Sequence, residues 1–296
     1  MNSQPAISDA LRGCNNKLRS IIEHFIELVD GLIAVTIEHE SVKSIRTENI
    51  PLPVPAAQVL SLMLQALGSS SNTLTRLSST SGLHTRDCYS IARSIVELAV
   101  NICYILAEGP SEAERAVRHA RQKSYQDIKR ESEISNAIIR LTHSNRPDPS
   151  AIEGLEADIA EFTSRSGREK GWVDLSIDKR IEIAGTKFGD SILNKLHFAR
   201  FMVYRHSSEI LHGTFFSALY FFGVTSPNNK QRTLSEAVEF IGQQQTMILL
   251  ATVLALSAVV EAFHKTCGFS WAYEQSRNLV DSLHEIEYLQ KTDIEA

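Results

Sequence analysis

The stretch Met247–Val260, MILLATVLALSAVV, decides the fold, because it is apolar around the whole circumference of a helix. It is shorter than the roughly 18 apolar residues that indicate a membrane-spanning helix, and Glu261 follows it directly. A helix that is apolar on every side but too short to cross a bilayer belongs in the middle of a bundle. We therefore expect Leu234–Cys267 to be a long central helix, and we expect no contact with a membrane.

On either side of this helix, apolar residues recur at three- and four-residue steps, and glycine and proline fall between the periodic segments. No run of alternating residues indicates a strand. The predicted fold class is all-α, a multi-helix bundle around the long apolar helix. The expected helices are Ile7–Glu40, Ala56–Leu77, Thr85–Glu108, Ser111 to about Thr142, Ala151–Arg165, Ile177–Ala184, Ser191–Leu211, Thr214–Phe222, Leu234–Cys267 and Trp271–Leu289.

The chain divides into an N-terminal amphipathic helix with its linker, residues 1–50, and a helical bundle, residues 51–296. The prolines between residues 49 and 55 disfavour helix at the residues before them, so this stretch is expected to be an extended connector. Residues 146–189 are the most irregular part. They contain too few apolar residues to close a second core, so we expect an inserted flap over the bundle.

Composition limits the function classes. The formal net charge of −5 attracts no nucleic acid globally, so RNA contact would need a local basic patch. The four cysteines have no CxxC spacing, which favours buried reduced thiols over a zinc site or disulfides. The first residues, MNSQPAISDALRGC, lack the basic start and apolar core of a signal peptide. We expect a cytoplasmic protein without a bound metal or other cofactor.

Polar residues form a stripe along the helix expected at Thr85–Glu108, at three- and four-residue steps that place them on one face. This face is either solvated or buried within the bundle. If it is buried, its charges must be paired, and Arg93 and Glu97 are spaced to pair with each other. Such a pair serves either a functional site or a structural salt bridge. The stripe consists of Arg86, Ser90, Arg93, Glu97, Asn101 and Tyr104.

A second polar group lies in Phe201–Gly213, FMVYRHSSEILHG, where Arg205 and His212 are two helical turns apart on one face. Gly213 ends or kinks the helix beside the histidine and would leave the imidazole accessible. An imidazole beside a guanidinium suits proton transfer at a phosphate or a ribose hydroxyl. The alternative is a histidine satisfied within the core and a surface arginine.

This pair resembles the arginine–histidine motif of the HEPN superfamily of helical nucleotide-binding domains. The order of Ala92–Ala99, Trp172–Arg180 and Tyr204–Gly213 is similar to that of an uncharacterised bacterial group, the domain-of-unknown-function 5677 family. The resemblance spans about Leu83 to Ala262, with the HEPN-like core at about 83–265. Many HEPN proteins are ribonucleases of bacterial defence or toxin–antitoxin systems, often with the site at a dimer interface. The resemblance thus implies RNA as substrate, a homodimer, and a protein partner such as an antitoxin.

By this resemblance, Arg205 and His212 would carry the chemistry of a metal-independent ribonuclease, with Arg93 and Glu97 in support. This requires that Glu97 and His212 meet in one pocket between packed helices. The residues expected to bind substrate are Tyr204, His206, Ser208, Glu209 and Asn101. Further basic residues that could contact RNA are Arg86, Arg180, Lys187, Lys195 and Arg200, and aromatic residues that could stack on a base are Tyr89, Trp172 and Tyr204.

Two other functions remain open. The polar residues could form a buried specificity network in a non-catalytic sensor or interaction protein. Alternatively, the two triplets Glu209-x-x-His212 and Glu261-x-x-His264, with Glu97 as a further ligand, could build a carboxylate-bridged di-iron site. The sequence lacks a clean single glutamate on its own helix between the two triplets, which argues against the di-iron site.

Overall fold

The computed structural model describes residues 7–41, 52, 54–135, 137–142, 147–221 and 233–291. The all-α prediction is confirmed, since helices dominate these residues and a single two-stranded sheet accompanies them there. Much of the predicted connector at 49–55 lies outside the described residues. The helices are α1 (Asp9–Ser41), α2 (Val54–Leu77), α3 (Thr85–Glu108), α4 (Pro110–Asp127), α5 (Leu155–Phe162), α6 (Ile177–Phe188), α7 (Asp190–Leu211), α8 (Phe215–Phe221), α9 (Leu234–Cys267), α10 (Ser270–Asp281) and α11 (Glu287–Lys291), with short 3-10 turns at Pro149–Ala151 and Ser282–Glu285.

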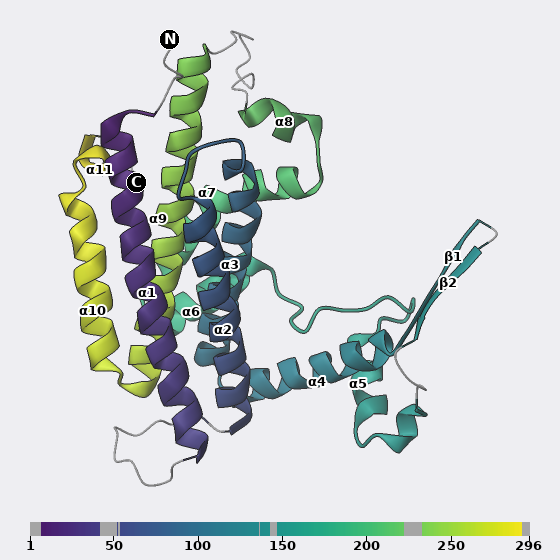
Figure 1. Ribbon diagram of the computed structural model, residues 1–296. Helices are drawn as coiled ribbons and strands as arrows, with labels where there is room; N and C mark the ends of the chain where they lie inside the picture. Colours follow the sequence, from purple (N-terminus) through teal and green to yellow (C-terminus); the bar gives the residue numbers. More distant parts are fainter. Residues whose placement is uncertain are drawn as a thin grey trace.

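Helix α9 is the centre of the bundle, and its bounds agree with the sequence prediction. Thr233 and Glu236 form a capping box at its start, and Gly268 ends it with a positive φ of 78°. Helices α1, α3, α7 and α10 all pack against it. In Figure 1, α1 and α10 lie on one side of α9 while α3, α6 and α7 lie on the other. Leu249, Val253 and Leu256 have no exposed surface.

Among the described residues, two helices, α3 and α9, are long and apolar enough to cross a membrane by length and composition alone. Their most apolar windows are 56% and 89% buried against other parts of the protein. Core helices of bundles meet the same criterion, so burial in the bundle accounts for this composition. All four cysteines, Cys14, Cys88, Cys103 and Cys267, are buried and free.

The prediction of one helix from Ser111 to about Thr142 is wrong. Helix α4 already begins at Pro110 and ends at Asp127, and the chain then forms an antiparallel hairpin of β1 (Lys129–Ile134) and β2 (Ala137–Thr142). The hairpin projects away from the bundle (Figure 1). One of its faces carries Ile139 and Leu141, which are 52% and 54% exposed. The side chains of the hairpin alternate between two exposed faces, which hid its period in a charged sequence.

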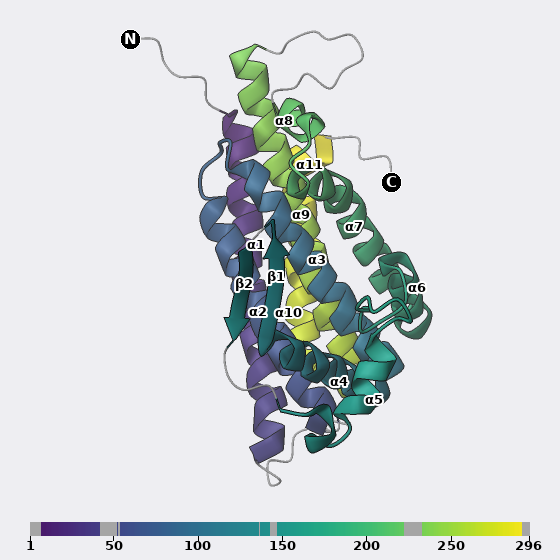
Figure 2. The same ribbon diagram turned by 90° about the vertical axis from the view of Figure 1, so that its right-hand side faces the viewer.

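Helix α4 extends outward from the bundle (Figure 1), and α5 packs beside it (Figure 2). Helix α5 is joined to α4 by ion pairs, in which Arg115 and Arg118 both contact Glu161 and Arg121 contacts the buried Asp158. The rings of Tyr104 on α3 and Trp172 pack in a T-shaped arrangement, with ring centroids 6.0 Å apart. The irregular region is therefore attached to an outward arm as well as to the bundle.

Candidate functional site

Helix α7 positions most of the predicted site residues. Its apolar residues Ile192, Leu196, Ala199 and Val203 are fully buried against the bundle, where α7 packs on α3, α6 and α9. The spacing of four, three and four residues explains why one face of α7 turns inward. The remaining faces carry the polar residues of the Phe201–Gly213 segment, which either meet α3 or face solvent.

One polar cluster joins α3 to α7. The Arg93 Nε donates to Glu97 Oε1 at 2.9 Å, so the pairing expected from the sequence is formed. The Tyr204 hydroxyl donates to the same carboxylate oxygen at 2.8 Å and accepts from the Arg93 guanidinium at 3.2 Å. That guanidinium also lies over the Tyr204 ring, 4.2 Å from its centroid. Each polar group of this triad thus has partners within it.

The electrostatics of the triad keep its phenol protonated. Burial raises the pKa of Tyr204, and the hydrogen bond to Glu97 raises it further. Burial is the largest single influence on the pKa of Arg93 and would lower it, but the hydrogen bonds and charges of Glu97 and Tyr204 together outweigh burial and raise the pKa. Tyr204 is therefore a donor and Arg93 a permanent cation at neutral pH, so the triad is built to hold helices together.

Further arginines surround the triad. Arg200 lies 5.4 Å from the centroid of the Tyr204 ring and pairs with Asp178 at 2.7 Å. Arg180 of α6 donates to the side chain of Asn101, a residue predicted to bind substrate. The Nε atoms of Arg180 and Arg200 are buried without a hydrogen-bond partner among the described residues. Burial is the main cause that lowers the pKa of Arg180.

Arg205 and His212 are both exposed on α7, and neither has a hydrogen bond or ion pair through its side chain within the part of the chain described. His212 caps the end of α7, and Gly213 follows with a positive φ of 61°. Tyr204, which binds Glu97, precedes His212 by eight residues, about 12 Å along the helix. The structure therefore places His212 apart from Glu97, whereas Arg205 directly follows Tyr204 and lines a pocket together with it.

An aromatic pocket of about 420 Å³ lies beside Arg205. His206 stacks on Tyr220 with ring centroids 4.3 Å apart, and Gln244 Oε1 accepts from the hydroxyls of Tyr220 at 2.6 Å and Tyr89 at 2.5 Å. Burial lowers the pKa of His206, and the charge of Arg205 lowers it further. The pocket is lined by Tyr89, Arg200, Phe201, Met202, Tyr204, Arg205, His206, Tyr220, Gln244 and Met247.

A second pocket, named the Arg86 pocket, has a volume of about 490 Å³. It lies beside Gly213, next to His212. It joins the start of α3 to the turn between α7 and α8. The Arg86 Nε is buried and has no hydrogen-bond partner among the described residues. The lining residues are Leu83, His84, Arg86, Asp87, Gly213, Thr214, Ser217 and Ala218. The exposed surface with Arg205 and His212 thus lies between two pockets.

Other predicted residues have structural partners. The Glu209 carboxylate accepts from the Thr214 hydroxyl at 2.7 Å and so supports the corner between α7 and α8. Ser208 is half-buried, and its carbonyl accepts from the His212 backbone at 3.1 Å. Lys195, expected near RNA, instead pairs with Glu261 at 2.8 Å. Tyr89 is 1% exposed, so its ring offers no free face for stacking.

The residues proposed for a di-iron site do not meet. The buried Glu261 accepts from Ser191 at 2.7 Å and pairs with Lys195 and with Lys265, at 2.8 and 2.9 Å, near the start of α7. Glu209 lies at the other end of α7, about 20 Å along the helix from Lys195. In the part of the chain that the structure describes, no three His, Cys, Asp or Glu side chains gather where they could hold a metal ion.

Sequence reasoning missed Tyr220 and Gln244 of the aromatic pocket. Gln244 belongs to the run Gln243-Gln244-Gln245 directly before the apolar part of α9. Polar residues that enter a helix apolar on all sides must find partners there. This signal was present in the sequence, but it did not indicate which side chains would be those partners.

Comparison with curated proteins and with solved structures finds no match to this chain. A family model does match, the Family of unknown function (DUF5677), over residues 58–231. The match begins in α2 and includes α3 to α8, and therefore both polar groups described above. Because it covers more than half of the chain, this protein belongs to the DUF5677 family.

Proposed function

We propose that this protein is a metal-independent endoribonuclease of the HEPN type, in which Arg205 and His212 act on RNA. The observation that carries the proposal is the exposure of both side chains on one face of α7 with no ion pair to another described residue. An arginine and a histidine left free in this way at the surface, next to pockets, are available to a ligand. The resemblance to the HEPN arginine–histidine motif supports the same assignment.

The chemistry follows from the two side chains. Their Cα atoms are about 10 Å apart along the helix, so one phosphate can lie between an extended arginine and a histidine. The 2′-hydroxyl of RNA would attack the adjacent phosphate, and the bond to the 5′-oxygen of the next nucleotide would break. His212 would move the proton, as general base or general acid. The Arg205 guanidinium would stabilise the negative charge that develops on the phosphate oxygens.

The pockets provide places for the flanking nucleotides. The aromatic pocket beside Arg205 combines aromatic rings, an amide and a second arginine, which are the groups that bind unstacked bases. The Arg86 pocket lies next to Gly213, at the other end of the pair. A strand of RNA that crosses the Arg205–His212 surface would therefore reach a pocket on either side.

The apolar residues around the pair favour a homodimer. Phe201, Leu211 and Phe215 are 76%, 58% and 77% exposed. Exposed apolar residues that flank polar groups mark protein interfaces. If the α7 helices of two copies pair antiparallel about a two-fold axis, Arg205 of each copy would approach His212 of the other, because two-fold symmetry repeats every contact in both directions. Two composite sites would result.

The test is cleavage of a single-stranded RNA in the presence of a chelator. We expect His212→Ala to reduce the rate by about 10²- to 10⁴-fold, the usual contribution of a general acid or base. His284→Ala, at an exposed histidine far from α7, is the matched control and should cleave like wild type. A DNA strand of the same sequence should stay intact, because it lacks the 2′-hydroxyl.

Equal cleavage by wild type and His212→Ala would sink the proposal. If RNA binds to both proteins and neither cleaves it, a non-catalytic interaction protein is the better interpretation of the function. Sedimentation of wild type and of Phe201→Asp tests the dimer separately, since a charge on this surface should dissociate two copies that pair through α7.

A further inference from the structure

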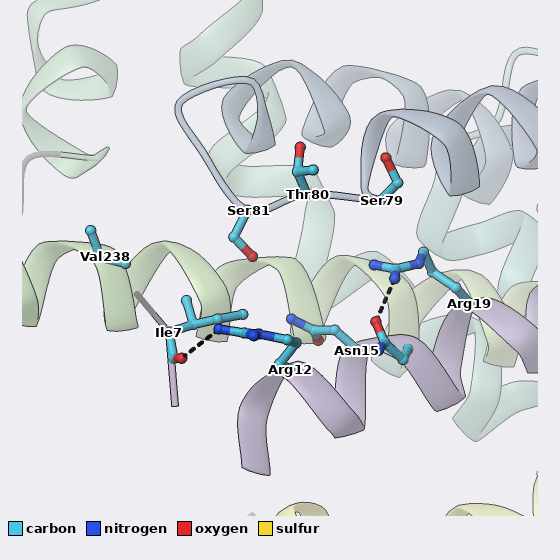
Figure 3. A pocket seen from close by; sticks show the side chains of 9 residues that line it. Ile7, Arg12, Asn15, Arg19, Ser79, Thr80, Ser81 and Val238 are labelled. Atoms are coloured by element: carbon cyan, nitrogen blue, oxygen red, sulfur yellow. Dashed lines mark hydrogen bonds between the residues drawn. The ribbon is translucent and has the colours of Figure 1, made fainter. Parts of the chain in front are cut away.

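A polar pocket of about 410 Å³ lies where the start of α1, the connection between α2 and α3, and the first turns of α9 meet. Figure 3 shows Arg12 and Arg19 on α1 beneath the loop of Ser79, Thr80 and Ser81. The lining contains two arginines and no carboxylate. It consists of Ile7, Arg12, Asn15, Asn16, Arg19, Ser79, Thr80, Ser81 and Val238. None of these residues lines the pockets beside Arg205 and His212.

The loop over this pocket is held from both sides. The Ser81 hydroxyl donates to the Gln245 side chain of α9 at 2.6 Å, and the Gln245 amide donates to the Ser78 carbonyl. Arg19 donates to the same carbonyl at 2.5 Å from the α1 side. Gln245 is 1% exposed, so these bonds form in a buried setting. The wall of the pocket is thereby fixed before any ligand binds, which reduces the entropy lost on binding.

The Arg12 guanidinium makes few and weak interactions within the described residues. Its only contacts in the described residues are the Ile7 carbonyl at 3.5 Å and the Asp9 carboxylate at 3.9 Å. The Arg12 and Asp9 side chains are 52% and 100% exposed, so this ion pair contributes little to stability. Most of the five N–H donors of Arg12 therefore remain available at the edge of the pocket.

Arg19 and Asn16 add oriented donors. Arg19 uses one N–H toward Ser78 and one toward the Asn16 side chain, at 2.5 Å. That bond occupies the Asn16 oxygen and leaves its amide N–H groups for a ligand. The hydroxyls of Ser79 and Thr80 line the same space and can rotate toward it. Cations and neutral donors thus converge on the pocket, and its lining supplies no negative charge to oppose an anion.

We propose that this pocket binds a small phosphate monoester, with its phosphate between Arg12 and Arg19 and under the Ser79–Ser81 loop. Arginine forks match phosphate oxygens in charge and geometry. A volume of about 410 Å³ suits a small molecule of this kind. A bound phosphate would tie α1 to the connection between α2 and α3, and the proposal does not depend on ribonuclease activity.

The experiment is thermal unfolding of the full chain in added phosphate or adenosine 5′-monophosphate, against chloride and acetate at equal ionic strength. A ligand that binds the folded state raises the Tm in a concentration-dependent way. We expect both phosphate compounds to raise the Tm of wild type above the values in chloride and acetate. An equal Tm in all four solutions would overturn the proposal without any variant, and an equal rise in acetate would overturn the assignment to phosphate.

Three variants locate the effect. Arg12→Gln removes a charged donor and should weaken phosphate binding by about 10- to 100-fold. Arg277→Gln is the matched control, because Arg277 is 70% exposed and pairs weakly with Asp281 at 3.6 Å. It should respond like wild type, and so should Arg205→Gln. A response lost in Arg205→Gln and kept in Arg12→Gln would place the phosphate on α7 and overturn the proposal.

The same phosphate chemistry could come from the end of an RNA strand. A 5′-phosphorylated and a 5′-hydroxyl oligonucleotide, each added to the Arg205→Gln variant, distinguish this source. If the pocket takes small molecules, the two strands should bind this variant equally. Tighter binding of the phosphorylated strand, lost again when Arg12→Gln is added, would overturn the small-molecule assignment.

Discussion

The Tyr204 hydroxyl of α7 donates a 2.8 Å hydrogen bond to the Glu97 carboxylate of α3, across 107 positions of the sequence. Arg93 completes the triad through Glu97 and the Tyr204 ring. The triad therefore fixes where α7 lies along α3. Through α7 it also sets the position of Arg205, the next residue in the chain.

Tyr204→Phe should lower the free energy of unfolding by about 1 kcal/mol, the usual contribution of one hydrogen bond. The loss stays modest because Arg93 still pairs with Glu97. Urea unfolding measures it, and Tyr273→Phe is the control, since the Tyr273 ring stacks on His264 and its hydroxyl has no described partner. The same loss in both variants would contradict the role of the triad.

Glu261 makes stability depend on pH. Burial is the largest single influence on the pKa of this carboxyl and would raise it, but the hydrogen bonds from Lys195, Lys265 and Ser191 and the charge of Lys195 together lower it below its ordinary value of 4.5. A carboxyl with a lowered pKa in the folded state stabilises the protein above pH 4.5, and this contribution is lost as the pH falls below that value. Between neutral and acid pH, the Tm of wild type should therefore fall further than the Tm of Glu261→Gln.

At neutral pH, Glu261→Gln should cost about 2 kcal/mol, because two lysines lose their shared counter-charge. The cost stays below the roughly 3–5 kcal/mol of a fully buried pair, since Lys265 is 36% exposed. Parallel Tm–pH curves for wild type and variant would show that the carboxylate is not the titrating group.

The imidazole of His206 should titrate below its ordinary value of 6.5, mainly because it is buried and also because Arg205 is adjacent. Arg205→Gln removes the smaller cause, so the pKa should rise and still remain below 6.5. Histidine NMR shifts followed against pH measure this change. Arg277→Gln should leave the titration unaltered, and an unaltered titration in Arg205→Gln would contradict the predicted coupling.

Two glycines give opposite predictions for the same substitution. A Cβ added at Gly185 of α6 would lie 2.6–3.1 Å from atoms of the Leu193 side chain, among them the Cβ of Leu193. A Cβ added at Gly13 of α1 would meet nothing within 4 Å. Gly185→Ala should thus destabilise the protein by about 1–2 kcal/mol through overpacking. Gly13→Ala should stabilise it by about 0.5–1 kcal/mol, because alanine favours helix. Urea unfolding of both variants measures the difference, and similar effects would contradict the close approach of α6 and α7.

The hairpin should be nearly independent of the bundle. Ile139→Thr replaces a side chain that is 52% exposed, so its effect on unfolding should stay within about 0.5 kcal/mol. Ile102→Thr, at a fully buried position of α3, should cost several times more. Differential scanning calorimetry compares them. An equally large loss in Ile139→Thr would mean that something covers the hairpin face.

The helices could be predicted because their signals are local. The apolar run of α9 and the Thr233 capping box lie within one segment, and the bounds of α9 were predicted to the residue. The pairing of Arg93 with Glu97 is equally local, since four residues on a helix bring two side chains together. The hairpin at 129–142 was missed because both its faces are exposed, so no buried side marks its period.

By itself, then, the sequence determined the long helices of the bundle and their apolar faces. Only the tertiary structure decided that Glu97 meets Tyr204 while His212 stays at the surface. The position of α7 along α3 decides which of these side chains meet. Many weak contacts between distant segments together determine that position. The partners of Gln244 and the pocket between Arg12 and the Ser79–Ser81 loop have the same origin, because their residues lie far apart in the chain and only packing brings them into contact.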